Sequence, residues 1–251
     1  MDGIKRFWKN LVKFWDFIWN DDSALSWVLN IIVAVILIKF IVYPGLGVLL
    51  GTPYPIVAVV SGSMEHGYAP EISNYGGYIE SDTQIQYKLC DGTKMVDKSL
   101  INLREFVPFT TFWSVCGEYY EDRGIEKEEF ETFPYKNGFN TGDIMILYGS
   151  KAENIKIGDI IVFQGARVNP KPDPIIHRVI SIKNGSSGYV FGTKGDHNHD
   201  TINKCNNNRD CIYESDIWES QVIAKAVIRI PYLGYIKIGA FNLFTKVQEL
   251  L

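Results

Sequence analysis

Three short segments of this 251-residue chain carry side chains that could together cleave an amide bond. Ser63 ends the turn Ser61-Gly62-Ser63, His177 lies within a run of β-branched residues, and Asp196 belongs to a Gly-Asp pair. A serine hydroxyl becomes a nucleophile when an imidazole accepts its proton, and a carboxylate can orient that imidazole. In the order Ser63, His177, Asp196 these residues are sufficient for an activated-serine hydrolase if the fold brings them together.

The segment around Asp196 also fits other chemistry. Asp196, His197, His199 and Asp200 resemble a set of metal ligands, which would make the chain a metal-dependent hydrolase. Aspartate in a turn more often hydrogen-bonds its own backbone, and a lone histidine in a strand, such as His177, is often a core residue. A non-catalytic, membrane-anchored binding module is therefore a further alternative.

Two N-terminal segments have the composition of a membrane anchor. Residues 3–19 place three Trp and other apolar side chains at helical spacing, which predicts an amphipathic interfacial helix within residues 1–22. From residue 25 to residue 43 nearly every residue is apolar, and a helix of that length spans roughly 28 Å, close to the thickness of a bilayer core. The sequence therefore predicts a transmembrane anchor within residues 23–50, with its helix ending at Pro44-Gly45.

The distribution of Lys and Arg predicts the orientation of this anchor. Four such residues lie before the apolar segment, and after Lys39 the next one is Lys88. Because positive charge is retained on the cytosolic side, we expect the N-terminus in the cytosol and residues 45 onward outside it. The prediction is a single-pass protein of the cell membrane whose catalytic domain is extracytoplasmic.

The remainder of the chain has the composition of short β-strands separated by turns. Two similar segments, in which a Gly-Asp turn leads into a buried strand, give strands at 144–147 and 160–163. Further strands are predicted at the following ranges: 175–182, 188–193 and 222–230. We expect a mainly β, barrel-like catalytic domain formed by residues 51–66 and 141–232. Residues 67–140 are expected to form an inserted cap or lid of mixed structure, and residues 233–251 a membrane-proximal tail.

Composition and cysteine positions limit the classes of function. The net charge of −4 argues against nucleic-acid binding, which requires a basic surface. No Cys-x-x-Cys pair occurs, so a zinc knuckle is not expected. Outside the cytosol, the pairs Cys90/Cys116 and Cys205/Cys211 could form disulfides.

Four segments together resemble type I signal peptidases of the archaeal and endoplasmic-reticulum kind. These segments, which follow an N-terminal anchor, are Ser61-Gly62-Ser63-Met64-Glu65, Gly158-Asp159-Ile160-Ile161-Val162-Phe163, Ile176-His177-Arg178-Val179 and Thr193-Lys194-Gly195-Asp196. The resemblance implies a β-rich peptidase that removes signal peptides from secretory preproteins after small residues, without a metal or cofactor. It also implies membrane lipid and the translocon as partners.

The resemblance carries roles onto individual residues. Ser63 would be the nucleophile, His177 the general base in place of the Lys of the bacterial branch, and Asp196 the acid of the Lys-Gly-Asp segment. Ser61 and the Ser63 N–H would stabilise the oxyanion. The family usually has a second acid a few residues further on, but position 202 is Ile, so Asp200 and Asp210 are alternative partners of His177.

The substrate is expected to lie extended beside the strand that precedes Ser63, because peptides often bind by adding a strand to a sheet edge. The residues expected to contact it are Ile56, Val57, Ala58 and Val60.

Overall fold

The computed structural model describes residues 2–71, 78–100, 105–165, 174–186, 188–206 and 210–235. The chain divides into two compact units, residues 1–53 and residues 54–251. Each unit is described by itself.

The first unit is helical. Helix α1 (Asp2–Asn20) is followed by α2 (Ala24–Leu37). Ser23 caps the N-terminus of α2, and its hydroxyl accepts a hydrogen bond from the Ser26 N–H. A π-helical turn, η1 (Ile38–Val42), and α3 (Tyr43–Leu50) continue α2 without a break, so that a single apolar helix covers Ala24–Leu50. Its 27 residues are long and apolar enough to cross a membrane.

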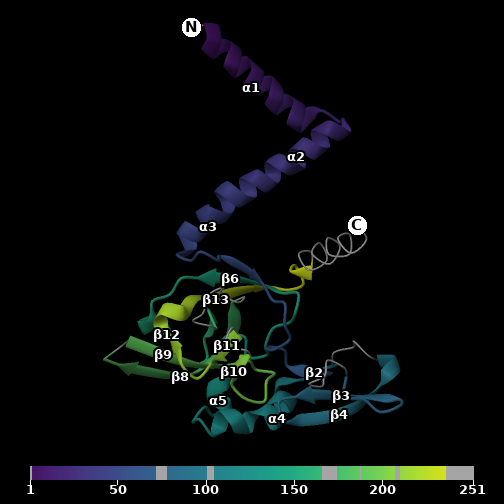
Figure 1. The fold of residues 1–251 in the computed structure, drawn as a ribbon, viewed down its shortest axis with the longest axis vertical. Coiled ribbons are helices and arrows are strands. Elements are labelled where there is room, and N and C mark those ends of the chain that lie inside the picture. The colour runs from purple at the N-terminus through teal and green to yellow at the C-terminus, as the bar shows by residue number, and fades with distance from the viewer. Residues whose placement is uncertain are drawn as a thin grey trace. The chain divides into compact units, whose positions relative to one another are not determined.

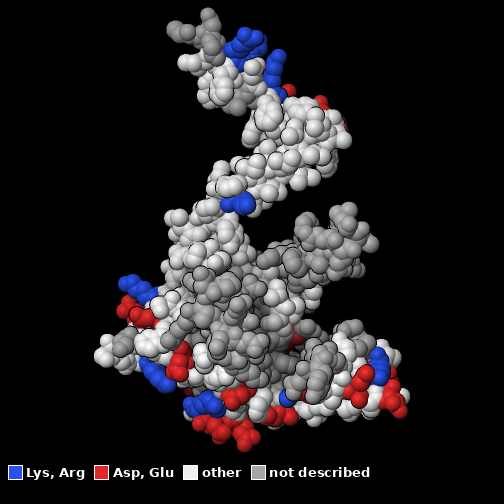
Figure 2. Space-filling view, viewed as in Figure 1, with Lys and Arg blue, Asp and Glu red and all other residues white. Residues whose placement is uncertain are grey.

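The prediction that this helix ends at Pro44-Gly45 is wrong. Pro44 lies in the first turn of α3, directly after the π-helical turn, and the helix ends at Leu50, followed by the capping residue Gly51 with a φ of 65°. A π-helical turn shifts the hydrogen-bond register by one residue, and this change of register is where a proline without an N–H can be accommodated. In Figure 2 the surface of this helix is almost entirely uncharged, as its sequence requires.

The second unit is built on a seven-stranded antiparallel sheet (Figure 1). In sheet order its strands are β1 (Ile56–Ala58), β6 (Ile144–Tyr148), β13 (Val222–Ile230), β7 (Ile160–Phe163), β8 (Ile175–Gly185), β9 (Gly188–Lys194) and β12 (Ile217–Trp218). Each strand predicted from the sequence is present, and the mainly β fold class is confirmed. Two short 3₁₀ turns, η3 (Ala152–Asn154) and η4 (Glu219–Gln221), connect elements of this sheet.

The two Gly-Asp turns that precede β6 and β7 have the same construction. Gly142 and Gly158 have φ values of 88° and 89°, a region that glycine adopts without steric cost. The following aspartates accept backbone N–H groups three residues earlier, at 2.7 Å for Asp143 and 2.9 Å for Asp159. Both carboxylates therefore stabilise the turns in which they lie.

A second, four-stranded sheet lies within residues 67–140. Its strands, in order, are β4 (Gly92–Asp97), β3 (Gln84–Leu89), β2 (Gly67–Pro70) and β5 (Glu105–Phe106). The helical elements of this region are η2 (Lys98–Leu100), α4 (Phe109–Glu121) and α5 (Lys127–Phe130). An aromatic core joins α4 and α5, and the predicted Cys90–Cys116 disulfide links α4 to the end of β3.

A small hairpin, β10 (Asn203–Asn206) and β11 (Asp210–Tyr213), completes the described elements. Its register places Cys205 opposite Cys211. The side chains of these two cysteines, and that of Asp210, lie outside the described residues, as does the predicted tail from residue 236 onward.

Candidate active site

Ser63 and His177 are in hydrogen-bond contact. Ser63 lies in the loop between β1 and β2, and His177 lies on β8, where it is directly opposite Ile161 of β7. The Ser63 Oγ is 2.8 Å from the His177 Nε2, and the imidazole is 3% exposed. A neutral imidazole at this distance is positioned to accept the hydroxyl proton.

The other ring nitrogen of His177 contacts a residue that the sequence does not single out. Nδ1 donates to the carboxylate of Glu214, which is fully buried between β11 and β12. Glu214 also accepts hydrogen bonds from the Thr193 hydroxyl at 3.3 Å and from the Ile202 N–H at 2.6 Å. A carboxylate at Nδ1 holds the ring proton there, so that the Nε2 lone pair faces Ser63.

The hairpin β10–β11 explains why Glu214 escapes detection in the sequence. The chain leaves the site at Ile202 and returns at Glu214, whose N–H donates to the Ile202 carbonyl at 3.0 Å. With residues 203–213 removed from the count, Glu214 directly follows Ile202, close to the place where the resemblance leads us to expect a second acid. The Cys205/Cys211 pair was the available signal, because it marks the inserted hairpin.

Asp196 does not occupy the position at His177 that the sequence predicts for it. Its buried carboxylate accepts two hydrogen bonds from Arg178, at 2.8 and 2.7 Å, and contacts His66 Nε2 and the Tyr120 hydroxyl, both at 3.0 Å. Burial alone would raise its pKa, but the Arg178 charge and these hydrogen bonds hold the pKa well below its usual range. Asp196 is therefore an ionised anchor beside the candidate pair and is not the partner of His177.

Asp200 is also separate from His177. It is exposed, and its carboxylate accepts a hydrogen bond from the Thr201 N–H at 2.6 Å. His199, the next residue toward the N-terminus, pairs with Asp91. Among the described residues, no group of three or more His, Cys, Asp and Glu is arranged to hold a metal ion, so the set Asp196, His197, His199, Asp200 does not form a common ligand cluster.

The loop from Gly195 to Asn198 closes against the candidate pair. A Cβ on Gly195 would lie 2.8 Å from His177 Nε2 and 2.7 Å from the Ser63 carbonyl, so only glycine permits this approach. The His197 N–H donates to the same Ser63 carbonyl at 2.9 Å. The backbone of the nucleophile candidate is thus held directly by this loop.

Two further features adjoin Ser63. The Ser61 hydroxyl is 3.2 Å from the Ser63 hydroxyl, on the exposed side of the loop. Strand β1 is an edge strand, because β6 is its one pairing partner among the described strands. Ile56, Val57 and Ala58 on β1 are partly buried, and Val60 is 70% exposed.

Comparison with known proteins finds relatives for part of this chain. No family model matches the chain. The signal peptidase complex catalytic subunits SEC11C of Homo sapiens and Mus musculus are 31% identical over 103 residues, 40% of this chain and 49% of theirs. The signal peptidase complex catalytic subunit SEC11 of Colletotrichum graminicola is 29% identical over 104 residues, 40% of this chain and 55% of its own. The chain thus spans about half the length of the curated relatives it matches. It is a homologue of the catalytic subunits of the signal peptidase complex.

Proposed function

We propose that this chain is a membrane-bound serine endopeptidase that removes signal peptides from secretory preproteins. The observation that carries the proposal is the contact series from the Ser63 hydroxyl to His177 and on to Glu214. In this series the nucleophile, the base and the orienting acid are each within hydrogen-bond reach of the next. The homology to signal peptidase catalytic subunits supports the same reaction class.

In the proposed reaction, His177 takes the Ser63 proton as the Ser63 oxygen attacks the scissile carbonyl. The Ser61 hydroxyl and the Ser63 N–H donate to the oxyanion, and one such donor lowers the barrier by about 3 kcal/mol. The imidazolium, stabilised by Glu214, then protonates the leaving amine. Water activated by His177 hydrolyses the acyl-enzyme and restores the free hydroxyl.

The edge of β1 that pairs with no described strand is the proposed binding site for the substrate chain. A peptide that pairs with this edge gains main-chain hydrogen bonds that fix its register, and only alternate side chains face the enzyme. Contacts with Ile56, Val57, Ala58 and Val60 would then favour small side chains next to the cut.

The apolar helix Ala24–Leu50 supports a location at the membrane surface. With the N-terminus in the cytosol, as the Lys and Arg distribution predicts, Ser63 would lie on the extracytoplasmic side of a cell membrane. The Cys90–Cys116 disulfide supports that compartment, since cytosolic thiols are kept reduced. Anchoring in lipid, close to the translocon, would reduce the search for a substrate that is itself membrane-bound.

The test is cleavage of a preprotein by the full chain purified in detergent. We expect Ser63→Ala and His177→Ala to abolish cleavage, and Ser150→Ala, a serine distant from the pair in sequence, to leave it unchanged. A fully active Ser63→Ala variant would refute the serine mechanism. Loss of wild-type activity on addition of EDTA would favour the metal-dependent hydrolase, and absence of cleavage by every form of the protein would favour the binding module.

A further inference from the structure

One face of helix α4 presents three buried side chains to the loop beside Ser63. Phe112, Cys116 and Tyr120 are spaced four residues apart, so they form a single stripe along the helix. Their exposed fractions are 0%, 2% and 0%. Helix α4 lies in the segment between β2 and β6, which contributes no group to the Ser63–His177–Glu214 series.

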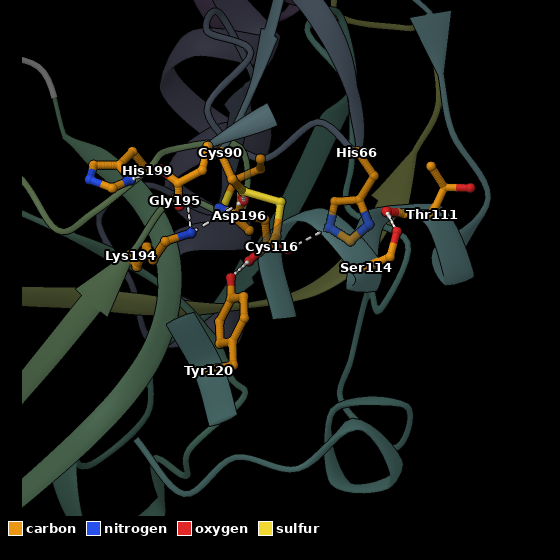
Figure 3. The surroundings of a disulfide bond; sticks show 12 residues. His66, Cys90, Thr111, Ser114, Cys116, Tyr120, Lys194, Gly195, Asp196 and His199 are labelled. Carbon is orange, nitrogen blue, oxygen red and sulfur yellow. Dashed lines mark hydrogen bonds and ion pairs between the residues drawn. A yellow bond between two sulfur atoms is a disulfide. The ribbon is translucent and has the colours of Figure 1, made fainter. Parts of the chain in front are cut away.

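All three side chains of this stripe converge on Asp196, directly or through one partner. The Tyr120 hydroxyl donates to the Asp196 carboxylate at 3.0 Å. The Phe112 ring stacks on His66, with centroids 3.5 Å apart and planes 6° apart, and His66 contacts the same carboxylate. Cys116 is bonded to Cys90, whose sulfur lies 3.3 Å from the Asp196 carbonyl oxygen. Figure 3 shows the disulfide and Tyr120 beside Asp196, with His66 linked to the same residue.

Asp196 in turn belongs to the loop that holds Ser63. Its N–H faces the Met64 sulfur at 3.4 Å, and the next N–H along the chain, that of His197, donates to the Ser63 carbonyl. Gly195, on the other side, packs against His177 Nε2. A displacement of Asp196 would therefore shift the backbone on which the nucleophile sits.

A purely structural core would not need these polar groups. Burying the Tyr120 hydroxyl and the His66 ring costs free energy unless each finds a hydrogen-bond partner. Phenylalanine at position 120 and leucine at position 66 would fill much of the same space without burying a polar group of their own. Both polar groups nevertheless contact the Asp196 carboxylate, and the next residue, His197, donates its N–H to the Ser63 carbonyl.

We propose that α4 acts as a positioning element for catalysis, with Tyr120 and His66 as positioning residues that fix the loop 195–198 against Ser63 and His177. This inference rests on the proposed function of that pair. On this view the segment between β2 and β6 is part of the machinery that aligns the nucleophile, in addition to any role as a lid.

The first experiment compares two tyrosines of one helix. In Tyr120→Phe we expect kcat to fall about tenfold with KM unchanged, because misplacement of a reacting group slows the chemical step without weakening substrate binding. Tyr119→Phe is the matched control, since the Tyr119 hydroxyl lies near Asp200. Ile125→Val, in the same core but without a polar contact to Asp196, controls for lost stability and should lower Tm while leaving kcat unchanged.

The second experiment separates hydrogen bonding from packing at His66. Glutamine can donate from the position of Nε2, and leucine cannot, so we expect His66→Leu to lose kcat and His66→Gln to recover most of it. If Tyr120→Phe does not fold, this pair alone decides the question.

The inference is overturned if Tyr120→Phe and His66→Leu retain wild-type kcat while their Tm falls as in Ile125→Val. It is also overturned if His66→Gln is as slow as His66→Leu. Ser63→Ala, assayed alongside, reports separately on the proposed function: a cleaving Ser63→Ala variant would remove the proposed function itself.

Discussion

His177 and Glu214 are in direct contact through Nδ1 of the imidazole, although 37 residues separate them in the chain. The carboxylate is fully buried and is held by Thr193 and the backbone of Ile202, so it has one orientation relative to the ring. This fixed geometry makes Glu214 the acid whose removal should matter most.

Glu214→Gln is expected to reduce kcat by about 10² to 10⁴-fold, because an amide stabilises neither the required tautomer nor the imidazolium. Asp200→Asn is the matched control and should retain wild-type activity. Initial rates of preprotein cleavage, with circular dichroism to confirm folding, provide the measurement. Equal losses in the two variants would contradict the assignment of Glu214.

Ser61→Ala should lower kcat by about 10² to 10³-fold with KM little changed, because an oxyanion donor acts mainly in the transition state. Ser61→Thr keeps the hydroxyl and should retain most of the activity. Steady-state kinetics on a peptide substrate distinguishes the two variants. A wild-type kcat in Ser61→Ala would contradict a role for the Ser61 hydroxyl as an oxyanion donor.

Replacing Cys90 and Cys116 together by alanine is expected to destabilise the second unit. The two cysteines are 26 residues apart, and closing a loop of that size contributes about 3.5 kcal/mol to the free energy of unfolding. The double variant should also lose kcat, since the disulfide lies against Asp196. Thermal denaturation and cleavage rates on the same preparation measure both effects. Unchanged Tm would show that other contacts already hold α4 in place.

Lys194 should make stability depend on pH in the alkaline range. Burial lowers its pKa to about 8, against the opposing charges of Asp196 and Glu214. Between this value and the ordinary pKa of 10.5, the unfolded chain binds a proton that the folded chain does not, so the free energy of unfolding rises with pH across that window. The slope from one group is at most about 1.4 kcal/mol per pH unit.

The matched variant for this effect is Lys194→Met, which keeps most of the side-chain length and removes the titrating group. Denaturant unfolding at several pH values, with the variant curve subtracted from the wild type, isolates the contribution of Lys194. If the difference in free energy of unfolding between wild type and variant falls as the pH rises, the lowered pKa of Lys194 is contradicted.

Local patterns were sufficient to predict much of the molecule. Continuous apolar residues identified the helix Ala24–Leu50, and β-branched runs after Gly-Asp turns identified the strands, because both signals depend on neighbouring residues. The sequence predicts Ser63 and His177 as a pair, and the Ser63 Oγ lies 2.8 Å from the His177 Nε2. Each of these two residues lies in a segment with a recognisable local pattern: Ser63 follows an apolar run and a turn, and His177 lies within a run of β-branched residues.

Two predictions are wrong for different reasons: one depends on residues distant in the sequence, and the other on a local turn without a composition signal. Asp196 was expected at His177, but Arg178, His66 and Tyr120 surround its carboxylate, and Tyr120 comes from a helix with no motif of its own. The end of the apolar helix was misplaced because a π-helical turn before Pro44 has no composition signal.

The hairpin β10–β11 has a consequence for how related sequences are compared. Because the chain departs at Ile202 and returns to it at Glu214, the number of residues between His177 and Glu214 is free to vary without moving either side chain. Loop-closure entropy grows only slowly with length, so insertions at this point cost little. A sequence search that requires a fixed interval between the Gly-Asp segment and the acidic residue would therefore miss Glu214. A search that allows an insertion of variable length after Ile202 would align it.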